Sequence, residues 1–332
     1  MTIAHTLDRT MLLRIQRYSI VLILVLVSAL FAFLSPVFLS AGNLSNILLQ
    51  AAATSIAAIG MTYVILLGEI DISIGAIISL AMTAGWVVAV SETISGQEAP
   101  VSLWVYPVGI LAGTLLGLVN AAIINYMKIN SFIATLATMF VFRGIAWKFV
   151  GSSDKPFSES AVLWLGRTEF LGIGLPVYLT IVLALLAGFI LKYTAYGRFV
   201  FAMGGSPRSA AETGIPAHTV RFIAYGMCGF CCAIAGLITI GRVGVLQAGL
   251  GMGFEFTVIA AVVLGGTSLL GGRGTISGSI LGSLLLVTIV NGLNLMNASV
   301  YIYDVVKGSI LIAGVIIDIM LMSRVETAKS KI

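Results

Sequence analysis

Residues 47–90 read ILLQAAATSIAAIGMTYVILLGEIDISIGAIISLAMTAGWVVAV, two long apolar runs separated by a short polar stretch around Gly68 to Ser73. Outside that stretch neither run contains Asp, Glu, Lys or Arg. A helix that crosses a bilayer needs about 20 mostly apolar residues, and its backbone groups must be hydrogen-bonded within the segment. We therefore expect each run to form a transmembrane helix, joined by a break that carries two carboxylates, Glu69 and Asp71.

The composition of the whole chain agrees with this interpretation. Of the 332 residues, 59% are hydrophobic and 9% are charged, whereas soluble domains carry about 25% charged residues. The mean hydropathy is +1.10. The net charge of +5 comes from bases at the ends of the apolar runs, which is typical of membrane topology and not of a nucleic-acid-binding patch. The chain is therefore expected to form one membrane domain.

About ten segments are long and apolar enough to be transmembrane helices. Together they predict an all-α polytopic membrane protein. The predicted spans are Ser19–Phe38, Ile47–Leu67, Ile72–Val90, Trp104–Tyr126, Phe132–Val150, Gly172–Leu191, Phe222–Gly241, Phe254–Leu270, Ile276–Met296 and Ile302–Met322.

The placement of Lys and Arg predicts how these spans are oriented. It puts residues 1–17 in the cytoplasm, and an even number of spans returns the tail, residues 324–332, to the same side. The membrane domain is then 18–323, with an extracytoplasmic loop at 151–171 and a long cytoplasmic segment at 192–221. We expect the chain in a bacterial cytoplasmic (inner) membrane, with its first apolar run kept as a span because no small-residue cleavage site follows it.

A faint internal similarity suggests a repeat. Residues 118–122, LVNAA, near the end of the fourth predicted span resemble residues 289–293, IVNGL, near the end of the ninth. These two spans run in opposite directions, as an inverted repeat of five plus five spans requires. A chance match of two Asn residues on apolar helices explains the similarity equally well.

The sequence offers little for catalysis, so we expect a translocation subunit and not an enzyme. Only His5 and His218 are present, too few for a histidine-based metal site or a Ser-His-Asp triad. The glycine-rich run Gly265–Gly274 lacks the Gly-Lys-Ser/Thr ending that holds nucleotide phosphates, and it predicts a helix break or tight turn instead. The cysteines at 228, 231 and 232 are expected to be small packing residues. No cofactor or metal is expected on this chain.

Polar side chains within the predicted spans are candidates for a solute pathway, because amides offer donors and acceptors without a fixed charge. Such side chains also serve as hydrogen bonds between helices, and Asp71 or Ser73 can cap the following helix. Arg143 is expected to extend toward the membrane surface. The pathway candidates are Asn46, Gln50, Glu69, Asp71, Asn120, Glu255, Asn291 and Asn294.

Several sequence blocks occur in order along nearly the whole chain. They are Gly60–Ile65 running into Gly68–Gly75, Asn130–Leu136 with Arg143–Gly144, Tyr196–Arg198, Ala202–Gly205, Gly214–Ile215 and Ile259–Ser268. In these blocks the sequence resembles the permease subunits of ribose-type ABC sugar importers, within the branched-chain amino acid/sugar permease superfamily. The resemblance implies a subunit that moves a small polar solute, such as a monosaccharide, inward by alternating access.

The resemblance also implies partners. These are ATP-binding cassette ATPase subunits that carry ATP and Mg²⁺, an extracytoplasmic solute-binding protein, and a second permease copy or paralogue, all in membrane lipid and without nucleic acid. In that family the long cytoplasmic segment seats in a groove of the ATPase. Carried over by position, the residues that would shape this contact are Gly204, Gly205, Ala210, Gly214 and Ile215.

The sequence departs from the family pattern in places. Ser206 stands where the family often has Asn, Glu69 where it often has a second Gly, and Thr257 where it often has Asp, so the solute is not inherited from the family name. Two alternatives fit the sequence: a proton-coupled secondary transporter that uses Glu69 and Asp71 as a relay, and a branched-chain amino acid ABC permease.

Overall fold

The computed structural model describes residues 20–94, 103–157 and 160–329 of the chain. Most of these residues are helical, and the strands among them form two short antiparallel pairs. The expected class, a mostly helical membrane protein, is therefore confirmed. The predicted N-terminal segment 1–17 lies outside the described residues, as do residues 330–332 of the predicted tail.

Six helices in the described part of the chain are long and apolar enough to cross a membrane. They are α2 (Ala41–Leu66), α4 (Val105–Met127), α5 (Ser131–Val150), α7 (Leu175–Tyr193), α10 (Ala217–Val243) and α12 (Ile276–Leu295).

Shorter apolar helices occupy three other predicted spans: Ile20–Leu34, the first part of α3 (Ile74–Ile94), and α11 (Phe254–Leu264). The last predicted span lies within α13 (Val300–Lys329). Each predicted span thus has a helix in its place, and the number of membrane crossings, ten, stays a prediction.

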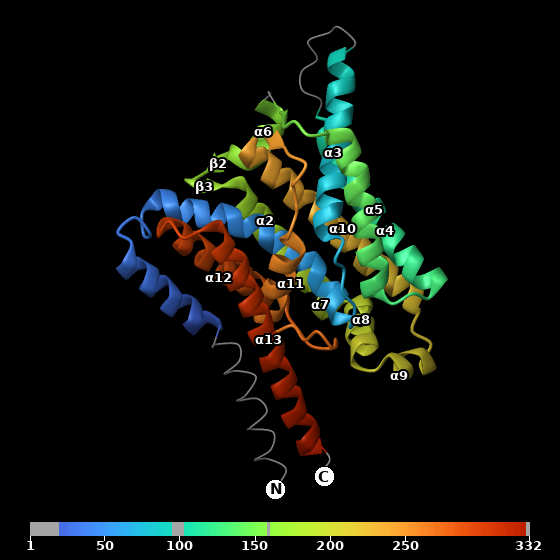
Figure 1. Ribbon diagram of the computed structural model, residues 1–332. Coiled ribbons are helices and arrows are strands. Elements are labelled where there is room, and N and C mark those ends of the chain that lie inside the picture. Colours follow the sequence, from blue (N-terminus) through green and yellow to red (C-terminus); the bar gives the residue numbers. More distant parts are fainter. Residues whose placement is uncertain (1–19, 95–102, 158–159, 330–332) are drawn as a thin grey trace.

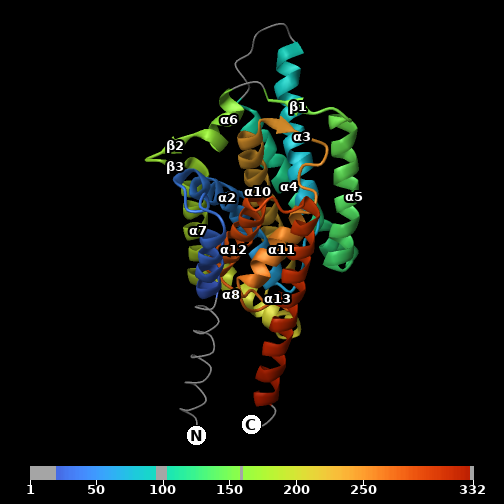
Figure 2. The ribbon, with the colours of Figure 1, turned by 60° about the vertical axis from the view of Figure 1, so that its left-hand side comes forward.

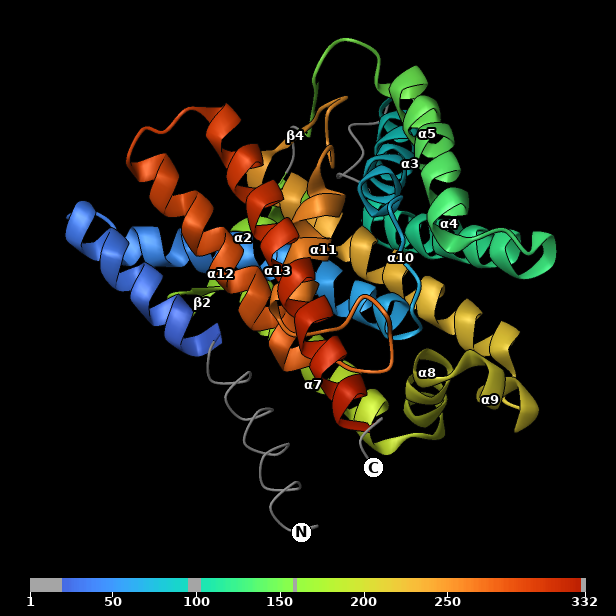
Figure 3. The ribbon, with the colours of Figure 1, turned by 60° about the horizontal axis from the view of Figure 1, so that its bottom comes forward.

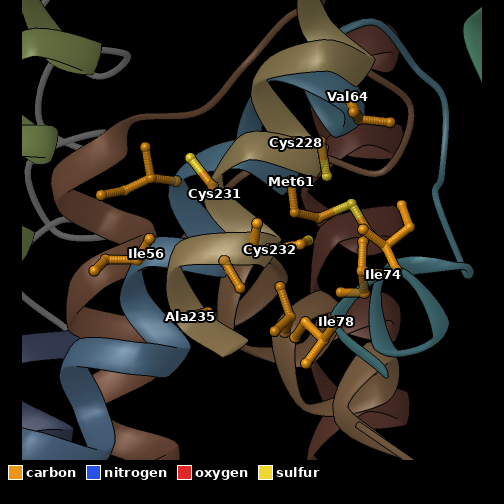
Figure 4. Packing of buried hydrophobic residues seen from close by; sticks show 14 of the residues in the cluster. Ile56, Met61, Val64, Ile74, Ile78, Cys228, Cys231, Cys232 and Ala235 are labelled. Atoms are coloured by element: carbon orange, nitrogen blue, oxygen red, sulfur yellow. The ribbon is translucent and has the colours of Figure 1, made fainter. Parts of the chain in front are cut away.

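Helices α2 and α10 cross at the centre of the domain (Figure 1). Both are buried along most of their length, and their small residues allow the two backbones to approach closely. A Cβ atom added at Gly60 of α2 would lie 2.8 Å from the Cα atom of Cys228 on α10. Figure 4 shows Cys228, Cys231 and Cys232 packed beside Met61, and all three cysteines are free and buried. They are packing residues, as predicted.

Two groups of helices pack on this central pair, and Figure 3 separates them. Helices α3 and α4 contact α10, and α5 lies against α3. In the second group α11 and α12 contact α2, and α13 lies against α11. The two groups therefore pack in the same order on opposite members of the central pair.

Two of the helices begin inside the domain, each after a short non-helical segment that we call a break. The first break is the predicted one, where α2 ends at Leu66 and α3 begins at Ile74. The second break lies before α11, which begins at Phe254. This helix ends at Leu264, so only 11 residues of the predicted span Phe254–Leu270 are helical. Its last residues form the glycine-rich turn, where Gly266, Gly271 and Gly272 have positive φ angles. Glycine adopts such angles without strain, and the helix therefore stops there.

The long loops predicted from the sequence lie at opposite ends of the domain (Figure 2). Residues 151–171 contribute β1 (Lys155–Pro156), α6 (Ser160–Arg167) and β2 (Glu169–Phe170), where β1 pairs with β4 (Val245–Leu246) and β2 with β3 (Ile173–Gly174). Residues 192–221 contribute α8 (Ala195–Gly205), α9 (Pro207–Glu212) and the start of α10. We call these the α6 end and the α9 end.

Candidate functional site

The break between α2 and α3 holds a carboxylate inside the domain. Asp71 is fully buried, and its Oδ1 accepts hydrogen bonds from the Ser73 backbone N–H at 2.9 Å and the Ser73 hydroxyl at 2.6 Å. Asn120 of α4 donates to the Ser73 hydroxyl at 2.7 Å and lies 3.4 Å from both carboxylate oxygens. Thr138 of α5 donates to Asn120 Oδ1 at 2.7 Å. Asp71 thus bonds to the residue just before α3, so its role as a cap of the first helical turn stays a prediction, and the network binds the break to α4 and α5.

Glu69, the second carboxylate of the break, forms an ion pair with Arg221 of α10. Arg221 Nε donates to Glu69 Oε1 at 2.7 Å, and the same guanidinium donates to the side chain of Asn125 on α4. Both ionic side chains are mostly buried. Arg221 therefore connects the break between α2 and α3 to α10 and, through Asn125, to α4.

A second charged pair lies where α3 and α11 begin. Glu255 is in the first turn of α11, and its Oε2 lies 3.8 Å from Nη2 of Arg143 on α5. The Glu255 carboxylate packs on Gly75 in the first turn of α3, where any Cβ atom would overlap it. The side chains are 4% exposed for Glu255 and 13% for Arg143. The expectation that Arg143 extends toward the membrane surface is wrong, because its partner lies inside the domain.

Asn46 and Gln50 lie together on α2 near the α6 end. Gln50 donates to Asn46 Oδ1 at 3.0 Å, and Arg242 near the end of α10 donates to the same oxygen at 3.0 Å. Arg242 also lines a cavity of about 320 Å³, whose other charged lining residues are Arg167 and Glu169. This cavity gives the α6 end a polar recess between α2, α6 and α10.

The two remaining pathway candidates, on α12, do not join these sites. Asn291 is buried and exchanges hydrogen bonds of 2.9 and 3.0 Å with Asn43 near the start of α2. Asn294 is exposed and accepts a hydrogen bond from the Tyr303 hydroxyl at 3.3 Å. Asn291 thus serves as a contact between helices, the alternative that the sequence left open for such amides.

The glycine-rich turn after α11 bridges the end of α2 and the end of α8. The Gly272 N–H donates to the Leu66 carbonyl at 2.9 Å. A Cβ atom at Gly271 would lie 2.7 Å from the Gly68 nitrogen, and one at Gly204 of α8 would overlap the Leu66 carbonyl and the Gly272 nitrogen. These backbones can meet only because none of these glycines has a side chain. The turn therefore connects α8 with the break between α2 and α3.

The five predicted docking residues divide into two groups. Gly204 and Ala210 are buried and Ile215 is half-buried, so they pack within the domain. Gly205 and Gly214 are exposed. Gly205 and Gly214 are therefore open to a partner, whereas Gly204 and Ala210 help to set the position of α8 and α9.

Helix α9 carries an exposed charged surface that the sequence analysis did not single out. Ser206 caps the helix and Pro207 occupies its first turn, a combination that favours a helix start. Arg208 and Glu212 form an ion pair of 3.2 Å with side chains 91% and 66% exposed. The Ser-Pro pair was the signal that could have located this helix.

Residues 43–315 match a family described as the permease component of branched-chain amino acid transport systems. That is most of the chain. The chain belongs to this permease family. The permease is 36% identical over 307 residues to ribose import permease protein RbsC of Escherichia coli strain K12. The aligned residues cover 91% of this chain and 93% of the relative. No solved structure matches it.

Other relatives of the permease have similar coverage. It is 38% identical to ribose import permease protein RbsC of Bacillus subtilis strain 168, over 86% of this chain and 88% of the relative. It is 33% identical to D-allose transport system permease protein AlsC of Escherichia coli strain K12, over 91% of each chain. Similarity of this extent along the whole length makes the permease a translocation subunit of the same kind.

Proposed function

We propose that this permease is the membrane-spanning subunit of an ATP-binding cassette importer that carries a monosaccharide into the cell. The observation that carries the proposal is similarity over 86% or more of the chain to permeases named for ribose and D-allose. The family description names branched-chain amino acids. A sugar is favoured over an amino acid because these full-length relatives are sugar permeases.

The proposed topology has ten crossings, with both termini and the α9 end in the cytoplasm of a bacterial inner membrane. Its support is the placement of Lys and Arg in the sequence. An inverted five-plus-five repeat is supported by the two helix groups, which pack in the same order on α10 and α2. It also fits the breaks before α3 and α11, and the similar segments around Asn120 and Asn291, which lie on the corresponding helices α4 and α12.

The proposed partners follow from the two ends of the domain. An ATPase, which binds ATP and Mg²⁺, would dock on the exposed side of α9, and a solute-binding protein on the α6 end. A second permease copy or paralogue completes the membrane part. Lipid would cover the exposed apolar side chains of α7, such as Leu185 and Phe189.

The contacts of α8 suggest how movement of the ATPase reaches the pathway. Closure of the ATPases on ATP would displace α9 and α8 together. Because Gly204 fits against Leu66 and Gly272 without space for a Cβ atom, this displacement would pass to the end of α2 and to the turn that follows α11. Both helices that begin inside the domain, α3 and α11, are attached there, so a rigid shift would expose the polar interior to one side at a time.

Reconstitution in proteoliposomes tests the proposal. With the ATPase and the sugar-loaded binding protein, we expect ATP hydrolysis to rise several-fold. D-Ribose, D-allose or L-arabinose, the sugar for which a further relative is named, should accumulate only when ATP is present. A protonophore should have no effect. Uptake by the permease alone that a protonophore abolishes would instead favour the secondary transporter, and stimulation only by an amino-acid-loaded protein would favour the amino acid permease.

A further inference from the structure

The Arg143–Glu255 pair leaves buried polar atoms without partners. Arg143 Nε and Nη2 and Glu255 Oε2 are enclosed and make no hydrogen bond with any residue that the structure describes. The separation of 3.8 Å between Nη2 and Oε2 is an ion-pair distance, but it is longer than an N–H···O hydrogen bond, which is about 2.9 Å. Buried polar groups are normally hydrogen-bonded. The donors and the acceptor of this pair are therefore available to a third group.

The pair lies near the middle of the membrane-spanning part. Helix α11 has 11 residues, about 16 Å at 1.5 Å per residue, so it cannot cross a hydrocarbon core of about 30 Å. Its last residue leads into the glycine-rich turn that contacts α8 at the α9 end, so its first turn, with Glu255, lies about 16 Å deeper. Arg143 stands about 18 Å along the 20-residue helix α5. Helix α3 also begins beside the pair, at Gly75. Broken helices that begin near the midplane are where transporters bind their solutes.

The opposite charges of the pair decide which chemistry it accepts. An isolated cation would be repelled by Arg143 and an isolated anion by Glu255, and the sugar permease relatives favour a neutral solute over a zwitterionic amino acid. A hydroxyl group has one donor and two lone pairs, so it can donate to the carboxylate and accept from the guanidinium at the same time. With the two facing atoms 3.8 Å apart, one hydroxyl oxygen fits about 2.8 Å from each. The pair is thus suited to a neutral polyol.

We propose that Arg143 and Glu255 form a binding site for a hydroxyl group of the transported sugar. The inference rests on the proposed import function and assigns the solute contact within it. The pair is enclosed in the structure, so the sugar would reach it when α5 and α11 move apart. The displacement of α8 described above supplies such a movement, because the glycine-rich turn that Gly204 contacts continues directly from α11.

The test replaces both charges at once, by Arg143→Met with Glu255→Leu. A buried ion pair exchanged for apolar side chains of similar size usually leaves a protein folded, whereas a single replacement would leave one charge buried and unpaired. In the complex reconstituted with ATPase and binding protein, we expect D-ribose uptake to fall by about tenfold or more, because a site that bonds a hydroxyl has been lost. Stimulation of ATP hydrolysis by the loaded binding protein should stay within about twofold of the unaltered complex.

The matched control is Lys307→Met with Asp304→Leu, which removes the charged pair of 3.6 Å on α13. This variant should transport D-ribose like the unaltered complex. Normal uptake by the Arg143/Glu255 double variant would overturn the inference and leave import intact. Loss of uptake together with a lowered unfolding temperature and lost ATPase stimulation would also overturn it, since the pair would then be structural. If the unaltered complex carried none of D-ribose, D-allose and L-arabinose, the proposed function itself would fail.

Discussion

Replacing Asp71 by alanine is expected to lower the thermal unfolding midpoint of the purified permease by about 5 °C or more, from a loss of about 2–4 kcal/mol. The Asp71 carboxylate accepts two hydrogen bonds from Ser73 at full burial, and the variant leaves both donors without that acceptor. A thiol-reactive dye can follow unfolding, because the three cysteines are free and buried in the folded protein.

Asp304→Ala is the matched control for this prediction. Its side chain is 84% exposed and pairs with Lys307 one turn away, and exposed pairs contribute about 0–1 kcal/mol. Its midpoint should therefore stay close to that of the unaltered protein. Equal midpoints for the Asp71 and Asp304 variants would show that the buried network does not hold the break between α2 and α3.

Gly204→Ala is expected to reduce ATP-driven uptake by about tenfold or more, because overpacking at a rigid contact costs about 1–3 kcal/mol or displaces the elements involved. The added Cβ atom would overlap the Leu66 carbonyl and the Gly272 nitrogen, which are backbone atoms and cannot rotate away. Helix α8 would then sit away from the glycine-rich turn. Uptake and ATP hydrolysis by the reconstituted complex measure the effect, and we expect uptake to fall more than hydrolysis.

Gly205→Ala supplies the comparison at the next position. A Cβ atom there meets nothing within 4 Å, so the unfolding midpoint should not change, whereas that of the Gly204 variant should fall. Gly204→Ala with normal uptake and normal stability would contradict the transmission of movement through this contact.

Local features of the permease could be predicted from its sequence. The polar stretch from Gly68 to Ser73 interrupts an apolar pattern and begins with a glycine, a combination that favours a helix end. The buried place of Asp71 beside the start of α3 could be anticipated, because the unbonded N–H groups at a helix start favour a nearby acceptor such as Asp71 or Ser73. The cysteines at 228, 231 and 232 could be assigned to packing because they fall within one apolar run.

Contacts between distant parts of the chain could not be predicted. The ion pair of Glu69 with Arg221 joins positions 152 residues apart, and nothing local distinguishes Arg221 from a base at a membrane surface. Arg143 was misplaced for the same reason, because a single arginine in an apolar run can turn toward lipid or inward. The linking role of the glycine-rich turn was also missed, since it depends on α2 and α8, which are far away in the sequence.

The central claim, that α9 is the cytoplasmic surface on which an ATPase docks, is tested most directly by labelling Arg208→Cys with a membrane-impermeant maleimide. The side chain at 208 is 91% exposed, and the native cysteines are buried, so the new thiol should be the one that reacts. We predict labelling in inside-out vesicles, protection when the ATPase is bound, and no labelling in right-side-out vesicles. Labelling in right-side-out vesicles, or no protection by the ATPase, would contradict the account.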